Sequence, residues 1–123
     1  MILLDSNIII YSIYPKSISL RDFIFNNDCL VSDISVVETL GFYKIEESEK
    51  NYLINFFGDI PTISIDKSII NAAIECRQSK KMTLGDSIIA ATAKSFKLKL
   101  ATKNIKDFSG LGIEVFDPMI EGN

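Results

Sequence analysis

The sequence contains no histidine, and this absence limits the chemistry that the protein can perform. Without histidine there is no Ser-His-Asp or Cys-His catalytic group, and no histidine-ligated zinc. Only two of the 123 residues are cysteines, Cys29 and Cys76, and their spacing is not that of metal ligands. We interpret both as buried core residues rather than as a disulfide. An active site must therefore be built from carboxylates, hydroxyls, amides and lysines.

Long hydrophobic runs are also missing. No apolar stretch reaches the length of a membrane span, although 47% of the residues are hydrophobic. The first residues lack the basic, apolar and small-residue order of a signal peptide, and Asp5 interrupts their apolar run. No linker, repeat or low-complexity segment is visible, so residues 1–123 are predicted to form a single domain. We expect no membrane association and a cytoplasmic location.

Charge is distributed unevenly along the chain. The segment 77–106 holds eight basic residues and one acid, Asp86, whereas the rest of the chain holds five basic and fifteen acidic residues. Such a basic segment favours a polyanionic partner, although a solvated lysine-rich face is a common alternative. The residues in it that we expect to contact nucleic acid are Arg77, Lys80, Lys81, Lys103 and Lys106.

Short apolar runs alternate with helical patterns. The predicted strands are residues 1–4, 29–31, 61–65, 98–102 and 113–116, and the predicted helices are 8–14, 17–26, 36–43, 46–57, a segment capped by Asp66, and 83–96. This order predicts an α/β fold, a three-layer α/β/α sandwich with a mainly parallel sheet of four to five strands. Right-handed crossovers would place the ends of the first, second and fourth strands at one edge.

Four carboxylates occupy positions that could meet at that edge. Asp5 follows the first strand directly, and Asp107 follows the fourth strand after a few residues. Glu38 lies near the start of the helix after the second strand, and Asp86 begins the helix that leads into the fourth. Each has an ordinary alternative, since aspartates favour caps and turns, and the patterns S-x-x-E at Glu38 and T-x-x-D at Asp86 resemble capping boxes.

The chemistry of such a group of acids is restricted. Like charges that lie close together raise one another's pKa or require a cation. Carboxylate oxygens without histidine or thiolate suit Mg²⁺ or Mn²⁺ rather than zinc. A divalent ion beside a basic segment suggests phosphodiester hydrolysis by water, with one or two ions activating it.

Four motifs in this order resemble those of the PIN domain family, most closely the short toxins of VapBC toxin–antitoxin systems. They are LLDSN at Asp5, ISVVETLGF at Glu38, LGDSIIAATA at Asp86, and ATKNIKDF at Asn104 and Asp107. The resemblance covers essentially the whole chain. It implies a metal-dependent ribonuclease in which Asp5, Glu38, Asp86 and Asp107 form the acidic metal-binding set, surrounded by the polar residues Ser6, Asn7, Thr102 and Asn104.

The resemblance also implies partners: an RNA substrate, a small antitoxin that covers the cleft, and a second copy of the chain in a homodimer. One departure is Ser6, where a threonine is usual, but the hydroxyl is kept. We favour a Mg²⁺- or Mn²⁺-dependent endoribonuclease toxin in which Asp5, Asp86 and Asp107 bind metal. Glu38 would bind metal or orient the attacking water.

Two other functions fit parts of the sequence. A catalytically silent PIN-like module would bind RNA or a protein without turnover, although a pure binder has little reason to gather four acids. A phospho-acceptor receiver domain has a similar length and element order. It would need a pair of acids after the first strand, and here Ser6 follows Asp5.

Overall fold

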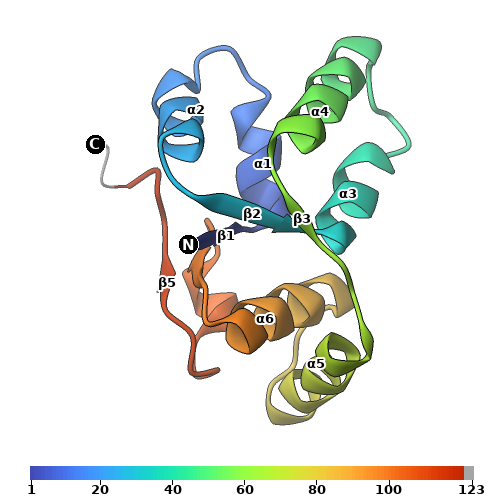
Figure 1. Ribbon diagram of the computed structural model, residues 1–123, viewed down its shortest axis with the longest axis vertical. Helices are drawn as coiled ribbons and strands as arrows, with labels where there is room; N and C mark the ends of the chain where they lie inside the picture. Colours follow the sequence, from blue (N-terminus) through green and yellow to red (C-terminus); the bar gives the residue numbers. More distant parts are fainter. Residues whose placement is uncertain (121–123) are drawn as a thin grey trace.

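A parallel β-sheet forms the centre of the protein (Figure 1). The computed structural model describes residues 1–120, over which five strands and six α-helices follow one another. The strand order is β3-β2-β1-β4-β5, and every neighbouring pair is parallel. In chain order the elements are β1 (Ile2–Leu4), α1 (Ser6–Ser12), α2 (Ile18–Phe25), β2 (Cys29–Ser32), α3 (Asp33–Leu40), α4 (Glu47–Asp59), β3 (Thr62–Ile63), α5 (Lys67–Ser79), α6 (Leu84–Phe96), β4 (Lys99–Ala101), the 3-10 helix η1 (Ile105–Phe108) and β5 (Val115–Phe116).

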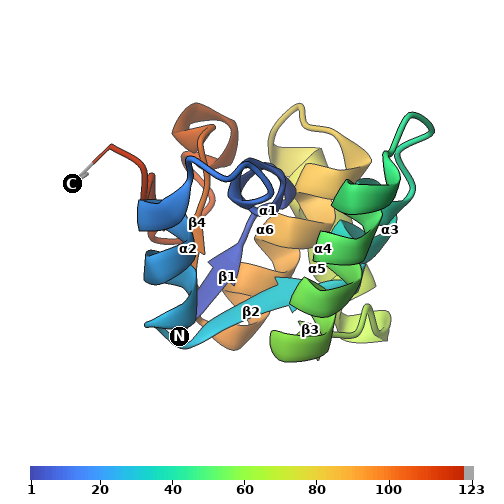
Figure 2. The same ribbon diagram turned by 90° about the horizontal axis from the view of Figure 1, so that it is seen from above.

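Helices cover both faces of the sheet, which confirms the three-layer architecture. The helices α1, α2 and α4 lie over one face, and α5 and α6 lie over the other (Figures 1 and 2). The helix α3 follows β2 directly and contacts α1, α4 and α6. It therefore connects the two layers beside the carboxyl ends of the strands.

The apolar run of β1 is explained by its central place. Alternate residues of a strand face opposite sides, and both sides are covered here. Leu3 is fully buried in the cluster that includes α5 and α6, and Leu4 is fully buried in the cluster of α1, α2 and α4. The next residue, Asp5, donates its backbone N–H to the carbonyl of Ala101 at 2.9 Å. Asp5 is thus fixed at the carboxyl edge, between β1 and β4.

The helix α6 carries Asp86 to the same edge. Small residues let this helix pack closely, and Ala90, Ala91 and Ala93 are completely buried between the sheet and α5. The helix begins after Thr83, whose hydroxyl accepts the Asp86 N–H at 3.1 Å. Because α6 leads back to the start of the parallel strand β4, its first turn must lie at the carboxyl edge.

Several local predictions were wrong. The helix α3 begins at Asp33 and is capped by Ser32, whose hydroxyl accepts the N–H of Ile34 at 3.1 Å. Ser35 and Glu38 therefore do not form a capping box, and Glu38 lies in the second turn. The predicted apolar position Tyr43 is outside the helix and 85% exposed.

Other local predictions were confirmed. Asp66 caps α5 by accepting the N–H of Ile69 at 3.0 Å. Cys29 and Cys76 are both buried and free of a disulfide. Within residues 1–120, no helix combines the length and the apolar character needed to cross a bilayer.

The packing of α6 against the sheet predicts the effect of truncating Ile89, which is fully buried. We expect Ile89→Ala to lower the free energy of unfolding by about 2–5 kcal/mol, because it removes apolar contacts and leaves a cavity. The matched control is Ile54→Ala in α4, since Ile54 is 51% exposed and its truncation should cost far less. Urea denaturation of the two variants measures the difference, and equal losses would contradict the packing described here.

Candidate active site

Asp5 is a buried carboxylate at the centre of the carboxyl edge, with only 5% of its surface exposed. Its Oδ1 accepts the N–H of Ser6 at 2.8 Å, and its Oδ2 accepts the hydroxyl of Thr102 at 2.7 Å. Each oxygen keeps further acceptor capacity, since a carboxylate offers about four lone-pair positions. Asp5 is therefore the N-cap of α1, and its fixed carboxylate still has lone pairs available.

The pKa of Asp5 is raised from 3.8 to about 6, chiefly because burial disfavours its charged form. The bonds from Thr102 and Ser6 act in the opposite direction, and the charges of Asp86 and Glu38 raise the pKa further. Glu38 and Asp86, which lie 33 and 81 positions after Asp5 in the sequence, thus act on it electrostatically. This is the convergence that the sequence predicts for three of the four acids.

Glu38 reaches the edge from α3 and is held by α1. The Ser6 hydroxyl donates to Glu38 Oε1 at 2.6 Å and also lies 2.8 Å from the Ser35 hydroxyl. Ser6 and Ser35 are buried, so this polar contact fixes the approach of the two helices. Ser6 thereby contacts both Asp5, through its backbone N–H, and Glu38, through its hydroxyl.

Asp86 and Asp107 line a shared surface cavity of about 370 Å³, together with Lys81, Met82 and Thr83. The pKa of Asp86 is raised, first by partial burial and then by the charge of Asp107, with Glu38 contributing less. Asp107 lies in η1 and is exposed. The four acids therefore form a connected series, in which Asp107 acts on Asp86 and both Asp86 and Glu38 act on Asp5.

The carboxylates of Asp5, Glu38 and Asp86 and the hydroxyls beside them offer oxygen ligands of the kind that a hard divalent cation prefers. Among residues 1–120, no three acidic or cysteine side chains stand close enough together to hold one ion as they are. Mg²⁺ generally keeps several water ligands and is bound through one or two carboxylates, so it does not require three preplaced acids. Asp5 and Asp86, which are close enough for the charge of Asp86 to raise the pKa of Asp5, supply two carboxylates of this kind.

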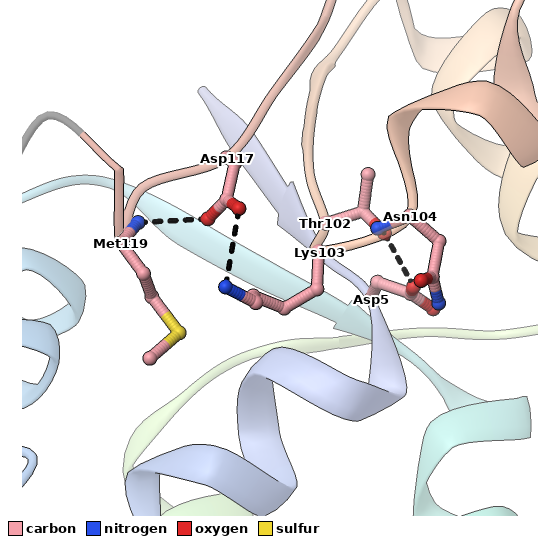
Figure 3. A network of polar contacts seen from close by, with 6 residues as sticks. All are labelled: Asp5, Thr102, Lys103, Asn104, Asp117 and Met119. Carbon is pink, nitrogen blue, oxygen red and sulfur yellow. Dashed lines mark hydrogen bonds and ion pairs between the residues drawn. The ribbon is translucent and has the colours of Figure 1, made fainter.

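The predicted supporting residues differ in their surroundings. Thr102 is completely buried, and besides donating to Asp5 it accepts the backbone N–H of Asn104 at 3.0 Å. Together these two bonds connect the turn between β4 and η1 to Asp5. Figure 3 shows Thr102 and Asn104 beside Asp5. Asn7 is exposed on the first turn of α1.

Two of the predicted RNA-contacting lysines have intramolecular partners. Lys80 Nζ donates to the carbonyls of Lys106 and Ser109 at 2.7 and 2.9 Å, which anchors the ends of η1 on either side of Asp107. Lys103 Nζ lies 3.3 Å from the buried carboxylate of Asp117, so it points away from Asp5 (Figure 3).

Arg77, Lys81 and Lys106 are exposed, and Lys81 lines the cavity beside the acids. These three residues are more exposed than Lys80 and Lys103, which are half-buried.

Sequence reasoning did not find Ser35, Gly85 or Asp117. Ser35 was assigned to a capping box, and nothing in its local pattern indicates a bond to a residue 29 positions earlier. Gly85 could have been noticed, because glycine is a poor helix former and occupies the second position of α6. Asp117 stands after the last strand, where an aspartate is ordinary in a turn.

The five-stranded parallel sheet with helices on both faces matches a PIN-like α/β/α fold. The sequence profile of the PIN domain matches residues 2–112, and the chain belongs to the PIN domain family. No curated protein sequence matches it significantly.

Solved structures similar to this chain include proteins of toxin–antitoxin complexes. FitAcB from Neisseria gonorrhoeae is 25% identical, with a TM-score of 0.78, and the match covers 98% of this chain and 99% of that one. A toxin–antitoxin complex from Klebsiella pneumoniae is 27% identical over 96% of this chain and 98% of that one, with the same TM-score. DNA-bound VapBC from Salmonella typhimurium has the same fold, with 23% identity, a TM-score of 0.81, and coverage of 95% and 97%.

The raised pKa of Asp5 predicts how stability depends on pH without divalent ions. The folded protein binds the Asp5 proton more tightly than the unfolded chain, so ionisation is less favourable in the fold. We expect the free energy of unfolding to fall as pH rises from about 4 to about 7, by at most about 3 kcal/mol. In the Asp5→Asn variant the side chain at position 5 cannot ionise, so most of this decrease in the free energy of unfolding should disappear. The part that remains comes from Asp86, whose pKa is also raised.

Urea denaturation in EDTA across this pH range measures the effect. At pH 7 the Asp5→Asn variant should be more stable than the wild type, and at pH 4 the two should converge. Curves that run parallel over the whole range would show that Asp5 is not the buried, unfavourably charged group described above.

Proposed function

We propose that this protein is a Mg²⁺- or Mn²⁺-dependent endoribonuclease that acts as the toxin of a toxin–antitoxin pair. The observation that carries the proposal is the gathering of Asp5, Glu38 and Asp86 from three separate elements, with the charges of Glu38 and Asp86 raising the pKa of Asp5. Such an arrangement is unfavourable without a cation. Membership of the PIN domain family and likeness to toxin–antitoxin structures support it.

The residues of this chain would divide the work. Asp5, Asp86 and Asp107 would hold one or two divalent ions, which when bound lower the pKa of water and stabilise the leaving oxygen. Glu38 would bind metal or orient the attacking water. Ser6 and Thr102 keep the carboxylates of Glu38 and Asp5 in place through the hydrogen bonds at 2.6 and 2.7 Å.

An antitoxin partner is supported by exposed apolar side chains on and just after α3, the helix that carries Glu38. Val37, Phe42 and Tyr43 are 67%, 52% and 85% exposed, and Phe42 lines a cavity of about 260 Å³ between α1, α3 and α4. An exposed apolar patch of this kind is typical of a protein interface. A cytoplasmic location and a homodimer remain part of the proposal. A small neighbouring gene whose product relieves toxicity on co-expression would favour the pairing.

RNA cleavage by the purified protein tests the proposed activity. We expect cleavage of a labelled RNA in Mg²⁺ or Mn²⁺ and none in EDTA. Asp5→Asn and Asp86→Asn should each reduce the rate by more than about 100-fold, since even the outer partners of metal ligands contribute about 10- to 100-fold. Circular dichroism checks that both variants are folded.

Cleavage that survives EDTA or Asp5→Asn would overturn this mechanism. RNA binding without cleavage in any metal would favour instead a PIN-like module that binds and does not turn over.

The exposed lysines near the acids predict a salt-dependent contribution to RNA binding. We expect Lys81→Ala and Lys106→Ala each to weaken binding and to reduce the slope of log K against log[salt] by about one. The control is Lys94→Ala, because Lys94 is exposed in the last turn of α6, at the opposite end from Asp86. Fluorescence anisotropy in EDTA measures binding without cleavage. An equal effect at Lys94 would mean that the contact is not local to the acids.

A further inference from the structure

Gly85 leaves room for the carboxylate of Glu38. A Cβ atom added to Gly85 would overlap Glu38 Oε2 and would lie 2.9 Å from Glu38 Cδ. The first turn of α6 and the side chain from α3 therefore meet at a point where a methyl group fits only if the Glu38 carboxylate moves. Gly85 also directly precedes Asp86, so the place that Glu38 occupies is next to a second acid.

Ser6 contacts the other oxygen of the Glu38 carboxylate. Its hydroxyl donates to Glu38 Oε1 at 2.6 Å and is itself placed by Ser35 at 2.8 Å. The carboxylate thus lies between a hydrogen-bond donor on α1 and the bare backbone of α6, while the residue keeps exposure to solvent. Both Asp5 and Asp86 sense its charge there, which agrees with this placement.

The backbone itself does not explain this glycine. Gly110 and Gly112 have positive φ angles, whereas Gly85 lies within a right-handed helix that alanine would favour. Glycine is needed at position 85 because the Glu38 carboxylate occupies the space that a Cβ atom would take. The protein therefore carries a poorer helix former at a position where the side chain of a neighbouring helix needs room.

We propose that Gly85 is a positioning residue, which sets the affinity of the site for a divalent cation by letting the Glu38 carboxylate lie between Ser6 and the first turn of α6. This inference rests on the proposed function, because it assumes that the acids bind metal. A methyl group at position 85 would push the end of the flexible Glu38 side chain outward and break its bond with Ser6. The fold itself would tolerate the change.

Gly85→Ala separates this role from a structural one, because its two effects differ in sign. We expect Mn²⁺ affinity, measured by isothermal titration calorimetry, to fall by about 10- to 100-fold. The Tm of the protein in EDTA should be unchanged or higher, since alanine is the better helix former. The matched control is Gly58→Ala, also within a helix, where an added Cβ meets nothing within 4 Å. It should leave Mn²⁺ affinity unchanged.

A double-mutant cycle tests whether Gly85 acts through Glu38. In the Glu38→Ala background, Gly85→Ala should have no further effect on Mn²⁺ affinity, because the carboxylate that it displaces is gone. Additive losses would overturn the inference, as would wild-type affinity in Gly85→Ala while the wild type binds Mn²⁺ and cleaves RNA. A wild-type protein that neither binds Mn²⁺ nor cleaves RNA would overturn the proposed function and the inference with it.

Discussion

The burial of one carboxylate, that of Asp5, is the constraint on which the rest of the site depends. The middle strand of the sheet ends just before this residue. Two hydrogen bonds to its carboxylate and one from its backbone N–H hold it between β1, α1 and β4. A buried charge is costly unless hydrogen bonds or a counter-charge compensate it, and here other acids lie nearby. The free protein therefore keeps an unfavourable arrangement in place, as proteins often do at functional sites.

Most of the fold was predictable, because its signals are local. Apolar runs marked the strands, and the alternation of strands and helices indicated a parallel sheet with its ends at one edge. The start of α3 was misplaced because Ser32 and Ser35 are equally good caps by composition. What decided between them was tertiary: Ser35 bonds Ser6 of another helix.

The candidate site was predictable in its acids and less so in its details. Residues that follow parallel strands lie at one edge of the sheet, so the approach of Asp5 and Glu38 could be expected from topology, whereas Thr102 was indicated only by the family resemblance. The contacts of the two lysines could not be predicted. Lys80 binds a carbonyl of the 3-10 helix η1, and Lys103 pairs with the buried Asp117, and neither partner is indicated by the local sequence. Gly85 needed the structure as well, since its role depends on what stands opposite.

The central claim is that folding gathers these acids around a divalent cation. Anomalous diffraction from crystals soaked in Mn²⁺ tests it most directly, because it locates the ion itself. The account predicts a peak within coordinating distance, about 2.5 Å or less, of oxygens of Asp5 and Asp86. A Mn²⁺ peak elsewhere on the protein, or none at the carboxyl edge of β1, would contradict it.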